Sequence, residues 1–342
     1  MQNPFVFGKA AEGVHFTDRK QDALRLSANL SHGINTVLIS PRRWGKTSLV
    51  KKVIEDVSSD EIKVVFIDIF HCKSAYDFLR TFATAVIKQT SSRMDEWISY
   101  AKGFLSNISP KFSFGTDPMN DFSLSFEWNE SADTEEAILA LPERICEKKH
   151  IRMVICLDEF QQIAEFPDSL TFQKKLRSVW QHQQAVNYCM FGSKRHLMEK
   201  IFNDKSMPFY KFGDMMFLQK IPASEWIPFI CGKFEETGKH IREEQAKESV
   251  SIPKTCLRMC FFSQREVEQL TEYQFNFLRA MADGITTGLG RQEVLKEYRL
   301  ESTSHIQSIK KALIKKGLIY EEGDSLVFDD PLFKRWILRH VH

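Results

Sequence analysis

The sequence predicts an α/β fold: a parallel sheet with helices on both faces, followed by a helical lid and a C-terminal winged helix-turn-helix. Short β-branched runs alternate with longer amphipathic stretches over the first two thirds of the chain. A lysine and a threonine follow the first of these runs, and two adjacent carboxylates follow a later one. The last part has the order of three helices and a two-stranded ribbon, which is typical of a winged helix.

The sheet is predicted by five runs of nearly continuous apolar residues, the pattern of strands that are buried on both faces. These candidate strands are residues 36–39, 64–69, 153–157, 187–191 and 215–219. An insert at residues 110–128 is predicted to be a hairpin, because apolar and polar side chains alternate on both sides of a turn signal. Its apolar residues are Phe112, Phe114, Phe122, Leu124 and Phe126. We expect them to pack on the core or to meet a partner subunit.

Composition limits the classes of partner and the compartment. The 342 residues contain 47 lysines and arginines against 45 aspartates and glutamates, so no overall charge draws the chain onto nucleic acid or an anionic membrane. The seven cysteines are scattered, without a CxxC pair, which indicates reduced thiols. The sequence shows neither a signal-peptide pattern nor a run near the roughly 18 apolar residues that span a bilayer. We therefore expect a cytoplasmic protein with no membrane partner.

Residues 40–47 have the features of a phosphate-binding loop. Phosphates bind where backbone N–H groups point inward at the start of a helix, and this loop lies between the first strand and a helix predicted at 48–56. Lys46 would bridge the β and γ phosphates of a nucleotide, and Thr47 would bind magnesium. Gly45 would let the backbone approach the phosphates closely.

The same loop departs from the usual GxxxxGK[ST] pattern at its first position, where Ser40 replaces glycine. Serine costs backbone freedom if that position is left-handed, but it is small and Pro41 already fixes the turn. The remaining residues predicted to line the phosphates are Arg42, Arg43, Trp44 and Ser48. The two arginines are either cationic neighbours of the phosphates or surface charges.

Two adjacent carboxylates, Asp158 and Glu159, follow the third strand. The aspartate would hold the magnesium shell, and the glutamate would polarise the attacking water. The alternative is a buried strand that ends in a solvated acidic pair. A GKT sequence after one strand and a DE sequence after a later one are hard to obtain by chance, so the sequence predicts a P-loop ATPase that uses ATP and Mg²⁺.

Weaker candidates follow the fourth strand. Ser193 could sense the γ-phosphate and Arg195 could stabilise charge in the transition state. Alternatively, Ser193 caps a helix and the basic residues after it are solvated. Gln161 and Gln162, just past the acidic pair, are interpreted as helix surface rather than catalytic residues.

Beyond the sheet the period becomes helical from residue 226 to 244, and we interpret residues 221–269 as the lid. In residues 270–342 the winged helix is predicted from helices at 273–283, 291–298 and 304–316 and strands at 317–320 and 325–328.

The motifs resemble those of the archaeal-type ATPases of prokaryotes, a branch of the AAA+ and STAND P-loop ATPases. The resemblance rests on residues 3–8 and 16–19, on the proline and two arginines before GKTSL, on the LDEF sequence at 157–160, and on residues 330–336. It implies a five-stranded ATPase core at residues 1–220, a lid and a winged helix. It also implies that Phe7 and Gly8 lie near the adenine, although residues of this kind could instead be an apolar anchor. Two features of the chain depart from the family. Lys20 stands where the family usually has glutamate, and the sequence with which the family's lid usually begins is not found in this chain.

Two interpretations of the function remain open. In one, ATP hydrolysis drives a switch or motor that acts with double-stranded DNA or a protein partner. Residues 291–316 carry seven lysines and arginines against three glutamates, and Lys310, Lys311 and Lys315 would contact phosphates. In the other, the chain is a STAND-type switch that holds ATP and seldom hydrolyses it, and the winged helix is a protein-interaction or autoinhibitory module. Self-association of the chain is a further expectation.

Overall fold

The structure is a computed structural model. It describes residues 19–41, 44–90, 93–105, 110–113, 122–126, 132–219, 221–251 and 270–340. Within these residues, no helix combines the length and the apolar character that crossing a bilayer requires.

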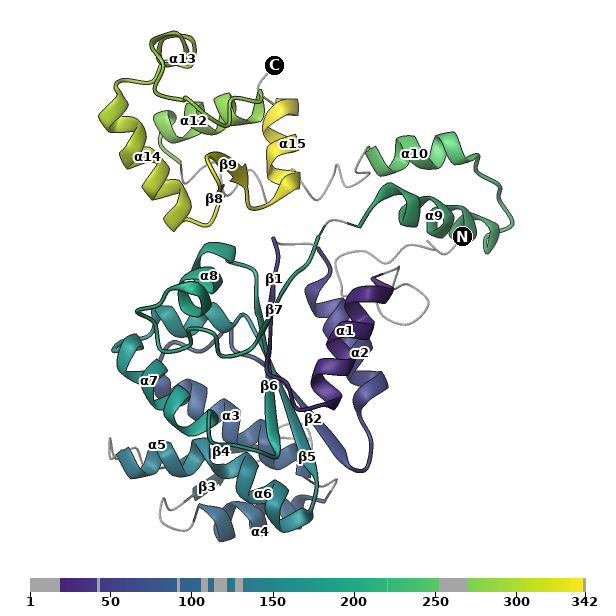
Figure 1. Cartoon of the computed structure of the whole chain (residues 1–342), viewed down its shortest axis with the longest axis vertical. Helices are drawn as coiled ribbons and strands as arrows, with labels where there is room; N and C mark the ends of the chain where they lie inside the picture. The colour runs from purple at the N-terminus through teal and green to yellow at the C-terminus, as the bar shows by residue number, and fades with distance from the viewer. Residues whose placement is uncertain are drawn as a thin grey trace.

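A five-stranded parallel sheet forms the centre of the first part of the chain (Figure 1), in the order β2-β5-β6-β1-β7. Its strands are β1 (Thr36–Ile39), β2 (Ile62–Asp68), β5 (Arg152–Asp158), β6 (Val186–Gly192) and β7 (Asp214–Phe217). All five predicted strands are confirmed. The inner strands β1, β5 and β6 are almost wholly buried, whereas the edge strands β2 and β7 are partly exposed. The strands that end at the two sequence motifs, β1 and β5, are separated only by β6.

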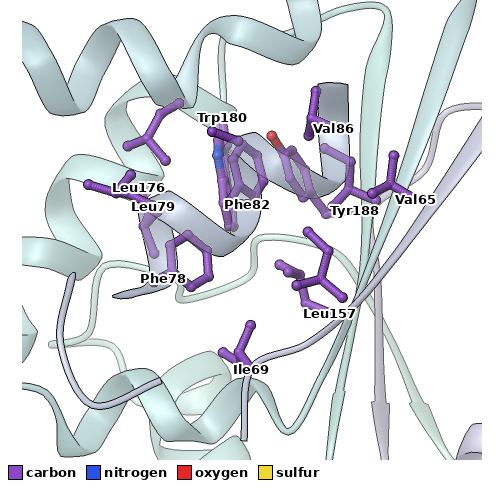
Figure 2. Close-up of a cluster of buried hydrophobic side chains, with 14 of the residues drawn as sticks. Val65, Ile69, Phe78, Leu79, Phe82, Val86, Leu157, Leu176, Trp180 and Tyr188 are labelled. Carbon is purple, nitrogen blue, oxygen red and sulfur yellow. The ribbon is translucent and has the colours of Figure 1, made fainter. Parts of the chain in front are cut away.

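Helices cover both faces of this sheet. On one face lie α1 (Lys20–Ser31) and α2 (Lys46–Val57), and α3 (Ala75–Thr90) lies on the other (Figure 1). The elements α6 (Leu141–Lys149), η3 (Phe160–Glu165), α7 (Ser169–Trp180) and α8 (Arg195–Asn203) also contribute to the core of that second face. Trp180 stacks on Tyr188 of β6 with ring centroids 4.0 Å apart, so aromatic side chains fill the space between helices and sheet (Figure 2).

The predicted hairpin is confirmed as β3 (Pro110–Ser113) and β4 (Ser123–Phe126), which pair antiparallel with Phe112 opposite Leu124. Phe122 and Leu124 are buried in the core, and Phe112 packs against it. The first of the two expectations, packing on the core, therefore holds for these three side chains. The helices α4 (Met94–Phe104) and α5 (Ala132–Leu139) flank the hairpin in the chain.

After β7 the chain forms two helices, α9 (Ala223–Glu235) and α10 (Glu243–Ser251). The prediction of one helical stretch from 226 to 244 was wrong, because residues 236–242 separate the two helices. The domain bounds of 1–220, 221–269 and 270–342 stay a prediction.

The last part forms the predicted winged helix, with its own hydrophobic core. It consists of α12 (Glu272–Ala282), α13 (Gln292–Glu297), α14 (Thr303–Lys315), the ribbon β8 (Ile319–Glu322) and β9 (Ser325–Phe328), and α15 (Pro331–His340). The final helix was not predicted. Figure 1 places the ribbon close to α8 of the sheet domain, and side-chain contacts described below join the two.

Candidate functional site

The predicted phosphate-binding loop has the geometry that its sequence indicates. Gly45 has a φ of +81°, a left-handed conformation that suits glycine, and α2 begins at the next residue. Ser40 is buried but is not left-handed, so serine costs nothing there. Lys46 is 7% exposed and donates from Nζ to the carbonyl oxygens of Ser40 (2.7 Å) and Pro41 (3.0 Å). Its ammonium thus lies within the loop.

The two motifs meet through one hydrogen bond. Thr47 Oγ1 donates to Asp158 Oδ2 at 3.0 Å, across 111 residues of sequence. This contact brings together the hydroxyl and the carboxylate that were predicted to bind magnesium. Oxygen atoms of this kind are the ligands that magnesium prefers, and the residues present therefore fit that ion.

Asp158 lies in an environment that disfavours its negative charge. Burial first, and then the nearby Glu159 and Asp68, raise the pKa of Asp158 to about 6, although the bonds from Thr47 and from the backbone N–H of Glu159 lower it. Asp68 was not predicted as a site residue. It is the last residue of β2 and lies directly opposite Asp158 of β5. Asp68 could have been predicted as a site residue because the carboxyl ends of neighbouring parallel strands lie side by side.

Glu159 is held in an unusual conformation at the turn after β5. Its φ is +55°, a left-handed value that a residue with a side chain adopts at some cost. Its backbone N–H donates to Asp158 Oδ1 at 2.8 Å. On its side chain, Oε2 accepts from Ser193 Oγ at 2.9 Å and from Nε2 of Gln161.

These contacts correct two sequence-based interpretations. Gln161 is 2% exposed and bonded to Glu159, so its assignment to a helix surface was wrong. The interpretation assumed the periodicity of an α-helix, whereas residues 160–165 form a 3₁₀ helix. Ser193 does not cap α8, whose N-cap is Lys194 and makes no capping bond with its side chain.

Arg195 joins the end of β6 to the winged helix. Its Nε donates to Glu199 at 2.8 Å within α8, and its Nη1 donates to Glu322 of β8 at 3.0 Å. The guanidinium also lies over the ring of Tyr320, 4.8 Å from its centroid. The side chain is 20% exposed, so the alternative of solvated basic residues was wrong for Arg195.

Arg19 is a further residue that the sequence reasoning did not assign to the site. It is 6% exposed and donates from Nη2 to the carbonyl oxygens of Trp44 (2.6 Å) and Gln219 (2.9 Å). It therefore connects the phosphate-binding loop to the segment after β7. A cavity of about 330 Å³ opens beside it, lined by residues that include Asp22, Gln219 and Glu225.

Four of the predicted site residues lie outside the described residues, namely Phe7, Gly8, Arg42 and Arg43, and so does Phe114 of the predicted hairpin. Ser48 lies in the first turn of α2 and is partly buried. On the winged helix, Lys311 and Lys315 are exposed on α14, whereas the ammonium of Lys310 pairs with Glu321 of β8.

Comparison with known proteins agrees with this description. Residues 262–339 match the model of a family described as a probable winged helix domain. A Walker-type ATPase of Pyrococcus abyssi superposes with a TM-score of 0.67 at 14% sequence identity, covering 98% of this chain and 99% of that one. The ORC2 protein of Aeropyrum pernix, solved as ADPNP and ADP complexes, superposes with a TM-score of 0.53 at 15% identity, covering 94% of each chain. No curated protein matches the sequence. This chain therefore has the fold of a Walker-type P-loop ATPase, and its C-terminal part is a winged-helix domain.

Proposed function

We propose that this chain is an ATP-dependent switch in which the bound nucleotide controls the position of the winged helix. The proposal rests on the two contacts that Arg195 makes with β8. Arg195 lies three residues after the end of β6, at the same sheet edge as Glu159, and therefore at the edge where a nucleotide would bind. The residue that would approach a γ-phosphate is thus held by the winged helix.

The nucleotide-binding half of the proposal assigns roles residue by residue. Lys46 would leave the carbonyl oxygens of the loop to bind the β and γ phosphates, since it is the loop's lysine and already lies inside it. Thr47 and Asp158 would hold Mg²⁺, which lowers the charge of the phosphates. Among the described residues, no group of three or more His, Cys, Asp or Glu side chains is placed to bind a metal alone. The site therefore relies on the phosphates as further ligands.

The hydrolytic half assigns Glu159 as the group that accepts a proton from the attacking water. Ser193 contacts this carboxylate at 2.9 Å, so we assign it to the same machinery. Hydrolysis would return the site to a state in which Arg195 again pairs with Glu322. Slow turnover and a long-lived ATP state both fit this scheme, so we favour the interpretation in which the chain holds ATP and seldom hydrolyses it.

Hydrogen exchange tests the switch without altering the chain. A non-hydrolysable ATP analogue with Mg²⁺ should increase amide exchange in β8 and at the start of α8, while ADP should leave both as in the nucleotide-free protein. Peptides from α3, which is buried far from the ribbon, are the internal control. Protection of the phosphate-binding loop without any change in β8 would leave an ATP-binding protein but contradict the switch.

DNA binding by α14 is a second candidate. It is favoured by Lys311 and Lys315, which are exposed four residues apart on one face of that helix. The neighbouring ribbon carries Glu321, Glu322 and Asp324, which would repel a phosphate backbone. We therefore rank DNA below a protein partner or self-association as the second contact of the winged helix.

A salt titration of binding to duplex DNA separates these candidates. If α14 contacts phosphates, replacing Lys311 and Lys315 by alanine should reduce the slope of log K against log salt by up to about 0.9 per contact, for all sequences alike. Lys174→Ala, which removes an exposed lysine of α7, is the matched control. No salt-dependent binding with ATP, with ADP or without nucleotide would exclude DNA as the partner.

A further inference from the structure

Gln161 is buried beside the candidate catalytic site, and among the residues that the structure describes only one end of its amide forms a hydrogen bond there. The residue is 2% exposed, and its amide nitrogen Nε2 donates to Oε2 of Glu159. Its amide oxygen Oε1 is buried without a hydrogen-bond partner within the described part of the chain. Burying an amide oxygen without a donor destabilises a fold. An apolar side chain of the same size would avoid that cost, so stability alone does not account for glutamine here.

Gly192, the last residue of β6, makes the space that this amide occupies. A Cβ atom at position 192 would lie 1.8 Å from Oε1 of Gln161 and 2.9 Å from its Cδ. Gly192 is not one of the glycines with a positive φ, so its backbone conformation is open to any residue. Gly45 differs, because its φ of +81° itself favours glycine. The added Cβ would also lie 3.1 Å from Sδ of Met198, but its severe overlap is with the Gln161 amide, so the lack of a side chain at 192 chiefly serves the packing of Gln161.

Both of the side-chain hydrogen bonds that the described residues make to Glu159 end on the same oxygen, Oε2. Two donors on one oxygen fix the rotation of the carboxylate and leave its other oxygen, Oε1, to be aimed at a water. The amide of Gln161 points its nitrogen toward Glu159, because turning the amide oxygen of Gln161 toward the carboxylate would place two hydrogen-bond acceptors together. A group held in this way is positioned before its substrate arrives.

We propose that Gln161 is a positioning residue for Glu159, and that Gly192 is glycine because that amide needs its space. The inference rests on the proposed role of Glu159 in hydrolysis. Gln161 would not touch the nucleotide, so its loss should slow turnover without weakening ATP binding. The expected loss is smaller than that of Glu159→Gln, which removes the base itself and should cost about 100- to 10,000-fold.

The variant Gln161→Met tests this most sharply, because methionine keeps the volume and removes both amide atoms. We expect kcat to fall about 10- to 100-fold, within the range of general-base effects, with the ATP Kd changed less than about twofold. The melting temperature should not fall, because the unpaired amide oxygen is removed as well. Because Gln161 would not touch the nucleotide, the effect should lie in kcat and not in the binding of ATP.

The control is Gln162→Met, one residue further along η3, where the side chain is partly exposed and bonds only weakly to Glu165 at 3.4 Å. This variant should behave like the parent. A Gln161→Met protein with the parent's kcat would overturn the inference. So would a lower kcat that appears only together with a lower melting temperature and weaker ATP binding, since that is the result of a merely structural role.

Gly192→Ala gives a second test, made in the parent and in Gln161→Met. If the added Cβ acts only by displacing the amide, it should lower kcat in the parent and change it little further in the Gln161→Met background. Equal losses in both backgrounds would contradict the inference. Failure of the proposed function is distinguishable: a parent that binds ATP without any turnover refutes the role of Glu159 itself, whereas normal turnover in both Gln161→Met and the parent refutes only Gln161.

Discussion

Arg195 at the start of α8 and Glu322 on the ribbon of the winged helix form an ion pair, with Nη1 and Oε1 3.0 Å apart. The two residues are 127 positions apart in the sequence. Glu199 holds Nε of the same guanidinium, and Tyr320 lies against its face. The candidate γ-phosphate residue is therefore shared between the sheet domain and the winged helix.

Removing Glu322 should release Arg195 toward the nucleotide. Glu322 is 56% exposed, and exposed ion pairs contribute about 0.2–1 kcal/mol, so Glu322→Ala should raise steady-state ATP turnover by about 1.4- to fivefold. The control is Glu321→Ala, because Glu321 pairs with Lys310 inside the winged helix instead. Equal turnover in Glu322→Ala and the parent would show that the pair does not restrain Arg195.

Replacing Arg195 itself should have the opposite effect. If its guanidinium stabilises charge on the transferring phosphoryl group, Arg195→Ala should lower kcat by about tenfold or more while ADP affinity stays within about twofold. Lys194→Ala is the matched control, since Lys194 pairs with Glu165 on η3. A parallel loss of ADP affinity would assign Arg195 a structural role.

Asp158 should make stability depend on pH in a defined direction. Its pKa in the folded protein is about 6, above the ordinary 3.8, so between these values the folded state binds more protons than the unfolded state. Stability therefore falls as pH rises through this window. Once Asp158 is ionised, the cost is at most about 3 kcal/mol, from 1.36 kcal/mol per pKa unit.

Asp158→Asn should remove that cost: its Oδ1 still accepts from the backbone N–H of Glu159, and the Thr47 hydroxyl can turn to accept from its Nδ2. In urea titrations without nucleotide or magnesium, we expect the variant to be more stable than the parent at pH 7.5, and the difference to disappear near pH 4. The same gain at both pH values would show that ionisation of Asp158 is not its cause. Magnesium-dependent ATP binding should be weaker in the variant at either pH.

The sheet could be predicted because its strands are nearly unbroken apolar runs, and the inner strands β1, β5 and β6 are buried on both faces. The winged helix could be predicted because its helices and ribbon are short, regular and separated by turns. The break between α9 and α10 was missed although the sequence carries a signal for it, because Gly238 has a φ of +72° just after α9, and a left-handed glycine commonly ends a helix. Domain bounds leave no comparable pattern in the sequence.

Within the site, sequence motifs predicted the residues whose chemistry requires one residue type, such as Lys46, Thr47 and Asp158. They did not predict those that act through tertiary contacts. Gln161 was interpreted as a surface residue. Its burial beside Gly192 depends on how η3 packs against the end of β6, and the local sequence does not show that packing. The pairing of Arg195 with Glu322 depends on how two domains meet, and local patterns carry no information about that.

The central claim is that the loop around Lys46 binds the phosphates of ATP. The most direct test is a titration of the full chain with fluorescently labelled ATP and Mg²⁺, in the parent and in Lys46→Ala. Lys51→Ala, in the next turn of α2, is the control for loss of a nearby charge. The account predicts saturable binding to the parent and to Lys51→Ala, and loss of tight binding in Lys46→Ala, because the γ-phosphate loses the lysine of the loop. Equal affinity in all three proteins, or no binding to the parent, would contradict it.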